Sequence, residues 1–197
     1  MNVHSLTMAK AEDKRTAILQ ATLALITENG FHATPIAMVA KEANVGAGTI
    51  YRYFESKEVL INELYAELKE HMGQAMMQQH NPAGTIKDKF YRYWLNLYHY
   101  FISNPQEFQF LEQYATSPYI TQVTKEENQR HYLPVIEFLQ EGMQQQVLRP
   151  MPIELMTALV YNAVTATVKL HLSAELSITD EVLQLALQSS WDGVKAI

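Results

Sequence analysis

The sequence of residues 34–57 is TPIAMVAKEANVGAGTIYRYFESK, and its pattern predicts two short helices joined by a tight turn. Apolar residues recur at helical spacing between residues 36 and 43, so the first helix is expected to have one buried face. The segment Asn44-Val45-Gly46 then interrupts this helix. Asn and Gly both tolerate the backbone of a sharp helix exit, which makes the interruption a turn rather than a flexible linker.

The second helix is predicted from about Ala47 to Phe54, with Ile50 and Phe54 directed inward. Its remaining residues are small, polar or aromatic and are left for a partner outside the protein. This layout is that of a helix-turn-helix whose second helix lies in the major groove of DNA. On the turn alone, an ordinary helical hairpin that binds nothing is an equally good interpretation.

The longer run from Thr49 to Leu60, TIYRYFESKEVL, resembles the signature of the tetracycline-repressor (TetR) family of bacterial transcription regulators. The segment from Ala17 to Thr34 is similar to the first helix of that family and its exit. The resemblance covers roughly residues 14–65. It implies a homodimer that binds a palindromic operator in double-stranded DNA. Repression that is released by a small-molecule effector is the common mode of the family.

The expected DNA contacts follow from this resemblance and from side-chain chemistry. Thr34 is expected to cap the first helix of the motif and to hold a phosphate. Ala47 offers a methyl group suited to a thymine methyl, and Gly48 lets the backbone come close. Gly46 stands where the family commonly has a capping serine. The complete set of expected DNA-binding residues is Thr34, Ala47, Gly48, Thr49, Tyr51, Tyr53 and Lys57.

Composition limits the class of protein. The chain has 197 residues, 48% of them hydrophobic, and no cysteine, which excludes disulfides and thiolate metal sites and fits a reducing cytoplasm. No stretch has the length of a signal peptide core or a membrane span, so we expect a cytoplasmic protein with no membrane partner. The formal net charge is −6, yet residues 1–57 hold six Lys or Arg against five Asp or Glu. We therefore expect affinity for DNA to come from a few contacts and from the two DNA-binding domains of a dimer acting together.

The rest of the chain predicts an all-α fold of about nine helices. Residues 1–56 are expected to form a three-helix helix-turn-helix domain, and residues 57–197 a helical bundle for ligand binding and dimerisation. One long helix is predicted from about Ile120 to Gln146, with Pro134 as a kink inside it. No segment alternates like a strand.

A ligand pocket is suggested by the helix around residues 89–101, KFYRYWLNLYHYF, in which aromatic side chains cover most of the circumference. Phe90, Leu97 and Phe101 of this helix are better explained as core. Tyr and Trp need polar partners when buried, which favours a cavity for a small hydrophobic or aromatic effector. The candidate pocket residues are Met72, Met76, Trp94, Tyr98, Phe108, Leu111 and Tyr114.

The last two predicted helices, at about residues 153–174 and 179–196, are apolar with small residues interspersed. The resemblance implies that they form a two-fold, four-helix dimer interface. The candidate interface residues are Tyr161, Val168, Leu187 and Trp191.

Two other classes of protein stay open. An enzyme would need a nucleophile–base pair or a metal cluster, and neither a His-Glu-x-x-His nor a Glu-x-x-His motif occurs. We therefore expect no catalytic residues, no metal site and no cofactor. A helical carrier of hydrophobic ligands would explain the aromatic helix but not the polar face near Tyr51. Salt-sensitive binding to duplex DNA distinguishes a regulator from both.

Overall fold

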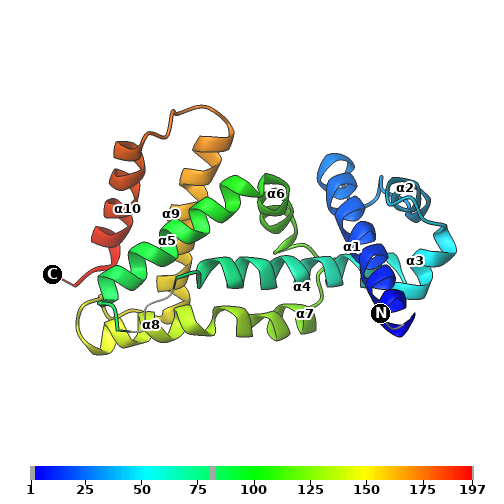
Figure 1. The fold of residues 1–197 in the computed structure, drawn as a ribbon. Helices are drawn as coiled ribbons and strands as arrows, with labels where there is room; N and C mark the ends of the chain where they lie inside the picture. The colour runs from blue at the N-terminus through cyan, green and yellow to red at the C-terminus, as the bar shows by residue number, and fades with distance from the viewer. Residues whose placement is uncertain (1–2, 80–82, 197) are drawn as a thin grey trace. The chain divides into compact units, whose positions relative to one another are not determined.

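The computed structural model describes residues 3–79 and 83–196, and its regular elements in these ranges are helices, which confirms the all-α prediction (Figure 1). One isolated antiparallel bridge joins Leu148 to Lys195. The elements are α1 (Val3–Asn29), α2 (Ile36–Glu42), α3 (Ala47–Tyr53), α4 (Lys57–Met76), α5 (Ile86–Ser103), α6 (Pro105–Tyr114), α7 (Gln122–Glu127), the 3-10 helix η1 (Asn128–Tyr132), α8 (Leu133–Gln144), α9 (Ile153–Leu172) and α10 (Asp180–Val194).

The single helix predicted from Ile120 to Gln146 is wrong, because the structure divides this segment into α7, η1 and α8. Pro134 lies in the first turn of α8 rather than in the middle of a helix. A proline lacks the N–H that a helix interior needs, but the first turn leaves that N–H unused. Pro134 therefore marks a helix start where a kink was expected.

The chain folds into two compact units. Unit 1 consists of Met1–Leu68 and Gln106–Glu127, and unit 2 consists of Lys69–Pro105 and Asn128–Ile197. Packing thus places most of α6 and all of α7 with the helix-turn-helix segment, although they follow α5 in the sequence. The functional division expected between residues 56 and 57 stays a prediction.

Unit 1 is held by a small apolar core and by one arginine. Ile18 and Ile26 of α1 are fully buried, as is Leu60 of α4. The guanidinium of Arg15 on α1 donates to Glu63 over 2.8 Å and to Glu67 over 2.7 Å, both on α4. Two charge-assisted bonds from one planar group fix the crossing of these helices better than apolar packing alone.

Unit 2 is built around α5, which packs against α8, α9 and α10. Helix α5 begins at a capping box, in which the hydroxyl of Thr85 accepts from the Asp88 N–H and the Asp88 carboxylate accepts from the Thr85 N–H. The Thr85 hydroxyl also donates to the Asp88 carboxylate over 2.7 Å, and this bond, together with the one from the Thr85 N–H, lowers the pKa of Asp88. Phe90 and Trp94 of α5 are fully buried. No helix in the described ranges combines the length and apolar character that crossing a membrane requires.

We predict that Gly142→Ala destabilises the protein relative to Gly193→Ala. A Cβ at residue 142 would lie 2.7 Å from Leu148 Cδ1 and 2.8 Å from Ile86 Cγ2, whereas a Cβ at residue 193 meets nothing within 4 Å. The helix propensity gained from alanine is shared by both variants, so the difference of about 1–3 kcal/mol reports overpacking. Urea denaturation measures it, and equal stabilities would contradict the close packing at residue 142.

Candidate DNA-binding face and ligand cavity

The turn between α2 and α3 has the geometry of a sharp helix exit. Asn44 adopts a left-handed backbone with φ of 52°, and the N–H of Val45 donates to the Ala40 carbonyl over 2.9 Å. Gly46 has an ordinary φ of −74° and is the N-cap of α3 without a side-chain cap bond. Asn44 rather than Gly46 therefore makes the turn, and Gly46 gives α3 no side-chain cap.

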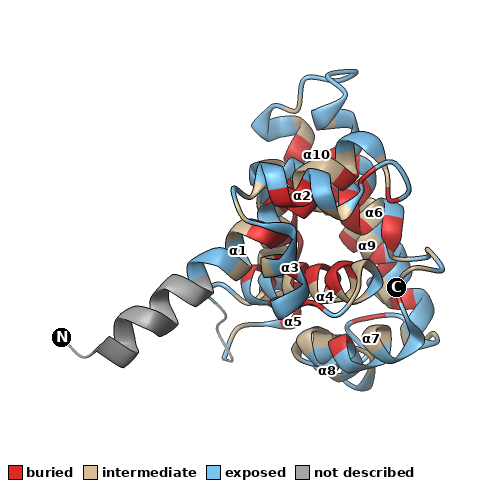
Figure 2. Cartoon of the chain, turned by 90° about the vertical axis from the view of Figure 1, so that its right-hand side faces the viewer, coloured by how far each residue is buried: buried red, intermediate tan, exposed pale blue. Residues whose placement is uncertain are grey.

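Helix α3 has a buried side and an exposed side, as the sequence predicted. Ile50 and Phe54 are almost completely buried inside unit 1. Tyr51 is 55% exposed. The other outward residues are Ala47, Gly48 and Arg52, which are exposed, and Thr49 and Tyr53, which are half-buried. Five of the seven expected DNA-binding residues thus lie together on one short helix (Figure 2).

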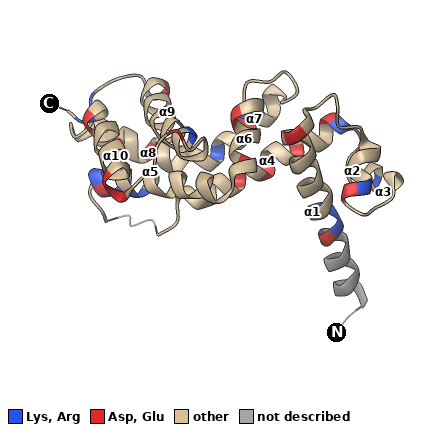
Figure 3. Cartoon of the chain, turned by 90° about the horizontal axis from the view of Figure 1, so that it is seen from above, with Lys and Arg blue, Asp and Glu red and all other residues tan. Residues whose placement is uncertain are grey.

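Few charges lie on this part of unit 1. Lys41 and Glu42 on α2 carry opposite charges, and Arg52 is the only charged residue within α3 (Figure 3). The exposed surface of α3 is therefore small, aromatic and only weakly basic. Such a surface suits close contact with a groove wall better than long-range attraction to phosphates.

Thr34 does not occupy the expected position. Its side chain is fully buried, and its hydroxyl donates to the Gly30 carbonyl over 2.8 Å and to the Leu25 carbonyl over 3.2 Å. The N-cap of α2 is Pro35, so the cap predicted at Thr34 is wrong. The hydroxyl closes the turn after α1, because it joins the carbonyl of Gly30, just after that helix, to the carbonyl of Leu25 in its last turns. It is not available for a phosphate in this conformation.

Lys57 is also directed inward. Its ammonium donates to the Phe31 carbonyl and lies 4.1 Å from the centre of the Phe31 ring. Partial burial lowers the pKa of Lys57, and the nearby Glu58 carboxylate opposes this shift. A phosphate would have to share the ammonium with Phe31, so the expected phosphate contact stays a prediction.

An aromatic clasp, which the sequence did not predict, joins the α6–α7 connection to the turn after α1. It consists of Phe31, His32, Tyr114 and Tyr119. The Phe31 and Tyr119 rings stack with centres 4.1 Å apart, and the Phe31 N–H donates to the Tyr114 hydroxyl over 3.1 Å. The Tyr119 hydroxyl and His32 Nε2 are 2.6 Å apart. Partners separated by 83 and 87 residues leave no local sequence signal.

Asn62 of α4 extends the clasp. Its amide nitrogen donates to the Tyr119 carbonyl over 2.8 Å, and its amide oxygen accepts from the Thr121 N–H over 2.9 Å. Tyr114 therefore belongs to unit 1, where burial raises the pKa of its hydroxyl. It does not line a ligand cavity as expected, and neither do Phe108 and Leu111, which are buried on α6 of the same unit.

A cavity of about 300 Å³ lies within unit 2. Met72 and Met76, two of the candidate pocket residues, line it, and their contact with a ligand stays a prediction. Trp94 does not, because it is fully buried in the core, and the hydroxyl of the buried Tyr98 is 2.6 Å from His171 Nδ1. The lining residues are Lys69, Met72, Met76, Tyr93, Tyr132, Val135, Ile136, Thr157, Ala158 and Tyr161.

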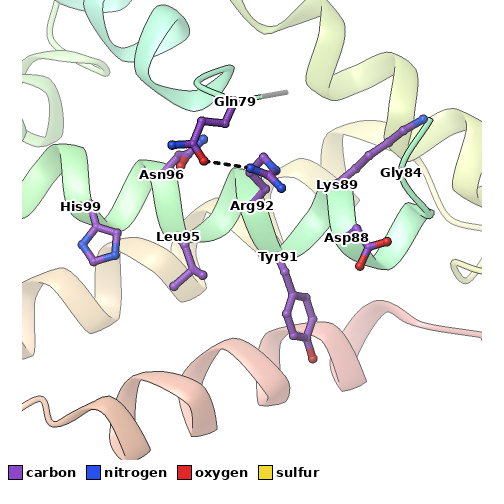
Figure 4. Close-up of a pocket in the computed structure, with 9 residues that line it drawn as sticks. All are labelled: Gln79, Gly84, Asp88, Lys89, Tyr91, Arg92, Leu95, Asn96 and His99. Carbon is purple, nitrogen blue, oxygen red and sulfur yellow. Dashed lines mark hydrogen bonds between the residues drawn. The ribbon is translucent and has the colours of Figure 1, made fainter. Parts of the chain in front are cut away.

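A second hollow along α5, of about 630 Å³, is polar (Figure 4). Lys89 forms a salt bridge of 3.0 Å with Glu141, and Arg92 donates to the Gln79 side chain over 3.2 Å. The amide of Asn96 donates to the carbonyls of Met76 and Gln78. Because these side chains already have hydrogen-bond partners within the protein, the apolar cavity is the better candidate for a ligand. The described residues contain no group of three or more His, Cys, Asp or Glu that could hold a metal ion.

Comparison with known proteins decides the family. A family model for bacterial regulatory proteins of the tetR family matches residues 18–64, and a model for the tetracyclin repressor-like C-terminal domain matches residues 85–195. The chain belongs to the TetR family. As a TetR-family protein it is a transcriptional regulator with a DNA-binding helix-turn-helix, formed here by α2 and α3.

Individual relatives of this TetR-family regulator agree. It is 36% identical over 80 residues to the HTH-type transcriptional regulator YhgD of Bacillus subtilis, and 36% identical over 85 residues to the fatty acid metabolism regulator protein of the same species. These matches span 41% and 42% of this chain and 42% of each relative. A TetR-family regulator from Marinobacter aquaeolei has the same fold, with a TM-score of 0.90 at 24% identity over 96% of this chain and 100% of that one.

The outward faces of the last two helices of this TetR-family chain carry exposed leucines. Leu155, Leu159 and Leu170 lie on α9, and Leu185 on α10 is 68% exposed. The expected interface residues face the other way. Val168 and Leu187 are fully buried inside the protomer, and a second copy could not contact them without rearrangement.

The two other expected interface residues also have partners within the protomer. Trp191 is largely buried and packs edge-to-face on Phe90, with ring centres 5.2 Å apart. Tyr161 lines the cavity. The prediction placed the interface on faces that form the core of unit 2, so it is wrong for Val168 and Leu187 and leaves little surface at Trp191.

We predict that Tyr114→Phe destabilises the protein by about 1–3 kcal/mol, because it leaves the buried Phe31 N–H without its acceptor. Tyr119→Phe is the matched control. It keeps the ring that stacks on Phe31 and removes only the more exposed hydroxyl bond to His32, so its cost should stay below about 1 kcal/mol. Urea denaturation of the two variants gives both values. A larger loss for Tyr119→Phe would contradict the clasp.

Proposed function

We propose that this TetR-family regulator is a repressor that binds a palindromic operator as a homodimer and leaves it when a small apolar or aromatic effector binds. Such a protein would act in the cytoplasm, on the bacterial chromosome. The observation that carries the proposal is the two-sided α3, whose inward residues complete the core while its outward residues include an exposed tyrosine.

The proposed DNA contacts are Ala47, Gly48, Thr49, Tyr51 and Tyr53. Tyr51 is central, because its exposed ring can lie along the groove wall while its hydroxyl donates to a phosphate. Ala47 and Gly48 let α3 approach the base edges closely, and a methyl group can contact a thymine methyl. Because few polar side chains of α3 can contact base edges, discrimination between DNA sequences would rest partly on the shape of the DNA.

The proposed dimer joins the outward leucines of α9 and α10. Two-fold symmetry brings the same patch of each copy together, which suits an exposed apolar stripe. A dimer can present its two recognition helices about 34 Å apart, the distance between successive major grooves. An effector that alters this spacing lowers DNA affinity without touching DNA.

A helical carrier or an enzyme without DNA binding would explain the cavity of unit 2 equally well. Neither would explain why an exposed tyrosine stands on a seven-residue helix after a sharp turn. Selection of bound duplexes from a random pool separates these functions, because a dimeric regulator enriches a palindrome and the rivals enrich nothing.

We predict that Tyr51→Ala weakens binding to the selected duplex by at least about tenfold, because it removes both the ring and the hydroxyl. Tyr51→Phe keeps the ring and should cost only a few-fold, the effect of one hydrogen bond near solvent. Gel-shift titration at fixed salt measures both. Undiminished binding by the alanine variant would remove Tyr51 from the DNA face.

We predict that Leu159→Glu weakens dimerisation by at least about tenfold, because it places a charge in the proposed apolar interface. Val123→Glu is the matched control, since Val123 is an exposed apolar residue on α7 in unit 1. Sedimentation velocity over a range of concentrations measures the dissociation constants. A wild-type monomer, or equal effects of both substitutions, would place the interface elsewhere.

A further inference from the structure

The cavity of unit 2 is open to solvent on the side of α9. Three of its lining residues, Thr157, Ala158 and Tyr161, come from that helix. Thr157 and Tyr161 are half-buried, whereas Ala158 is the one exposed residue among those that line the cavity. A ligand that fills the cavity of about 300 Å³ would therefore reach water at Ala158. One protomer alone leaves part of such a ligand uncovered.

The opening borders a row of exposed apolar residues on the same helix. Residues three or four positions apart are neighbours on a helix surface, so Ala158 adjoins Leu155. The outward row of α9 consists of Leu155, Leu159, Ala166 and Leu170, all of them exposed. At 3.6 residues per turn these four lie within about 60° around the helix axis. The row therefore begins at the rim of the cavity.

The polar side chains beside this row make their hydrogen bonds within α9. The Asn162 amide nitrogen donates to the Ala158 carbonyl over 2.8 Å. The Thr157 hydroxyl lies 3.0 Å from the carbonyls of Ile153 and Glu154, to either of which it can donate. Polar groups that already have partners cost less to cover with apolar surface. The row and the rim of the cavity are therefore suited to burial.

The order of residues in the outward row fits a second copy of the same helix. A two-fold axis through the middle of the row would run the two copies of α9 antiparallel. Leu155 would then face Leu170 of the partner subunit, and Leu159 would face Ala166 of the partner subunit. The second pair places a large side chain against a small one, which lets two helices interdigitate closely. The row is thus complementary to itself, as a two-fold interface requires.

We propose that a second copy of this chain completes the cavity. The copy packs on the outward row of α9 and covers the opening at Ala158, so that each small apolar or aromatic ligand is held between its own protomer and the partner subunit. The proposal rests on the homodimer proposed above and adds that the ligand site is complete only in that dimer. Ligand binding and dimerisation are then linked, because each supplies surface that the other covers.

Sedimentation velocity of the wild-type protein with and without 2-naphthol tests this linkage. At about 30 Å³ for each water molecule of the liquid, the cavity has room for about ten waters, which suits this flat and mostly apolar probe. We expect each cavity to bind the probe at least about fivefold more tightly in the dimer than in the monomer. Linkage is reciprocal and a dimer has two cavities, so saturating probe should lower the dimer dissociation constant by the square of this factor, at least about 25-fold.

Three variants separate the effect of the partner from direct effects on the cavity. Leu185 is exposed on α10 and does not line the cavity, so Leu185→Glu should weaken dimerisation and, where the variant is monomeric, weaken calorimetric probe binding at least about fivefold. Val123→Glu, at an exposed residue of unit 1, should leave both unchanged. Ile136→Phe fills the cavity from α8 rather than from α9, and it should abolish probe binding and the effect of the probe on dimerisation.

A dimer dissociation constant that the probe leaves unchanged would overturn the proposal, as would equal probe affinities of monomer and dimer. Absence of probe binding to the dimer would overturn it too. A probe effect that persists in Ile136→Phe would place the probe outside the cavity, with the same consequence. A wild-type dimer that ignores the probe removes only the shared cavity. A wild-type chain that stays monomeric at every concentration, with and without probe, removes the proposed homodimer itself.

Discussion

Helix α3 depends on the burial of its own inward side. A helix of seven residues is not stable alone in water, because the cost of nucleation exceeds the few hydrogen bonds it gains. Ile50 and Phe54 supply the missing free energy by entering the core of unit 1, where both are almost fully buried. The outward residues are therefore not needed to hold the helix in place. The buried residues keep α3 rigid, and the outward residues form a chemically specific surface on it. The left-handed backbone conformation of Asn44 allows the buried side of α2 to pack into the same core.

The same core is closed by a distant segment. Residues 106–127 return to unit 1 and attach to it through the clasp of Phe31, His32, Tyr114 and Tyr119. The chain therefore crosses between the units at three points, after Leu68, after Pro105 and after Glu127. These three crossings are the covalent routes by which a ligand in unit 2 could influence α3. The clasp fixes the middle segment on the turn that precedes α2, next to the Lys57 ammonium.

Local patterns predicted local structure well. The sharp turn at Asn44 and the inward side of α3 follow from residues a few positions apart, and the structure confirms them. Long-range pairing was not predictable from one sequence. Thr34 looked like a cap because nothing local shows that the carbonyls of Leu25 and Gly30 take its hydroxyl. Helix α9 is apolar on both sides, so periodicity did not reveal that Val168 faces the core while Leu159 faces outward.

The weak charge of the DNA-binding part and the leucines of α9 and α10 are linked under the proposed function. Residues 1–57 carry only one more Lys or Arg than Asp or Glu, so the DNA-binding domain of one protomer gains little from attraction to phosphates. When a dimer joins two DNA-binding domains, the second domain binds DNA in an intramolecular step once the first is bound. This raises the affinity for DNA without new contacts. The gain exists only while the dimer holds. Under the proposed function, exposed leucines that would be a liability on a monomer would therefore determine DNA affinity, although they lie in unit 2 and α3 lies in unit 1.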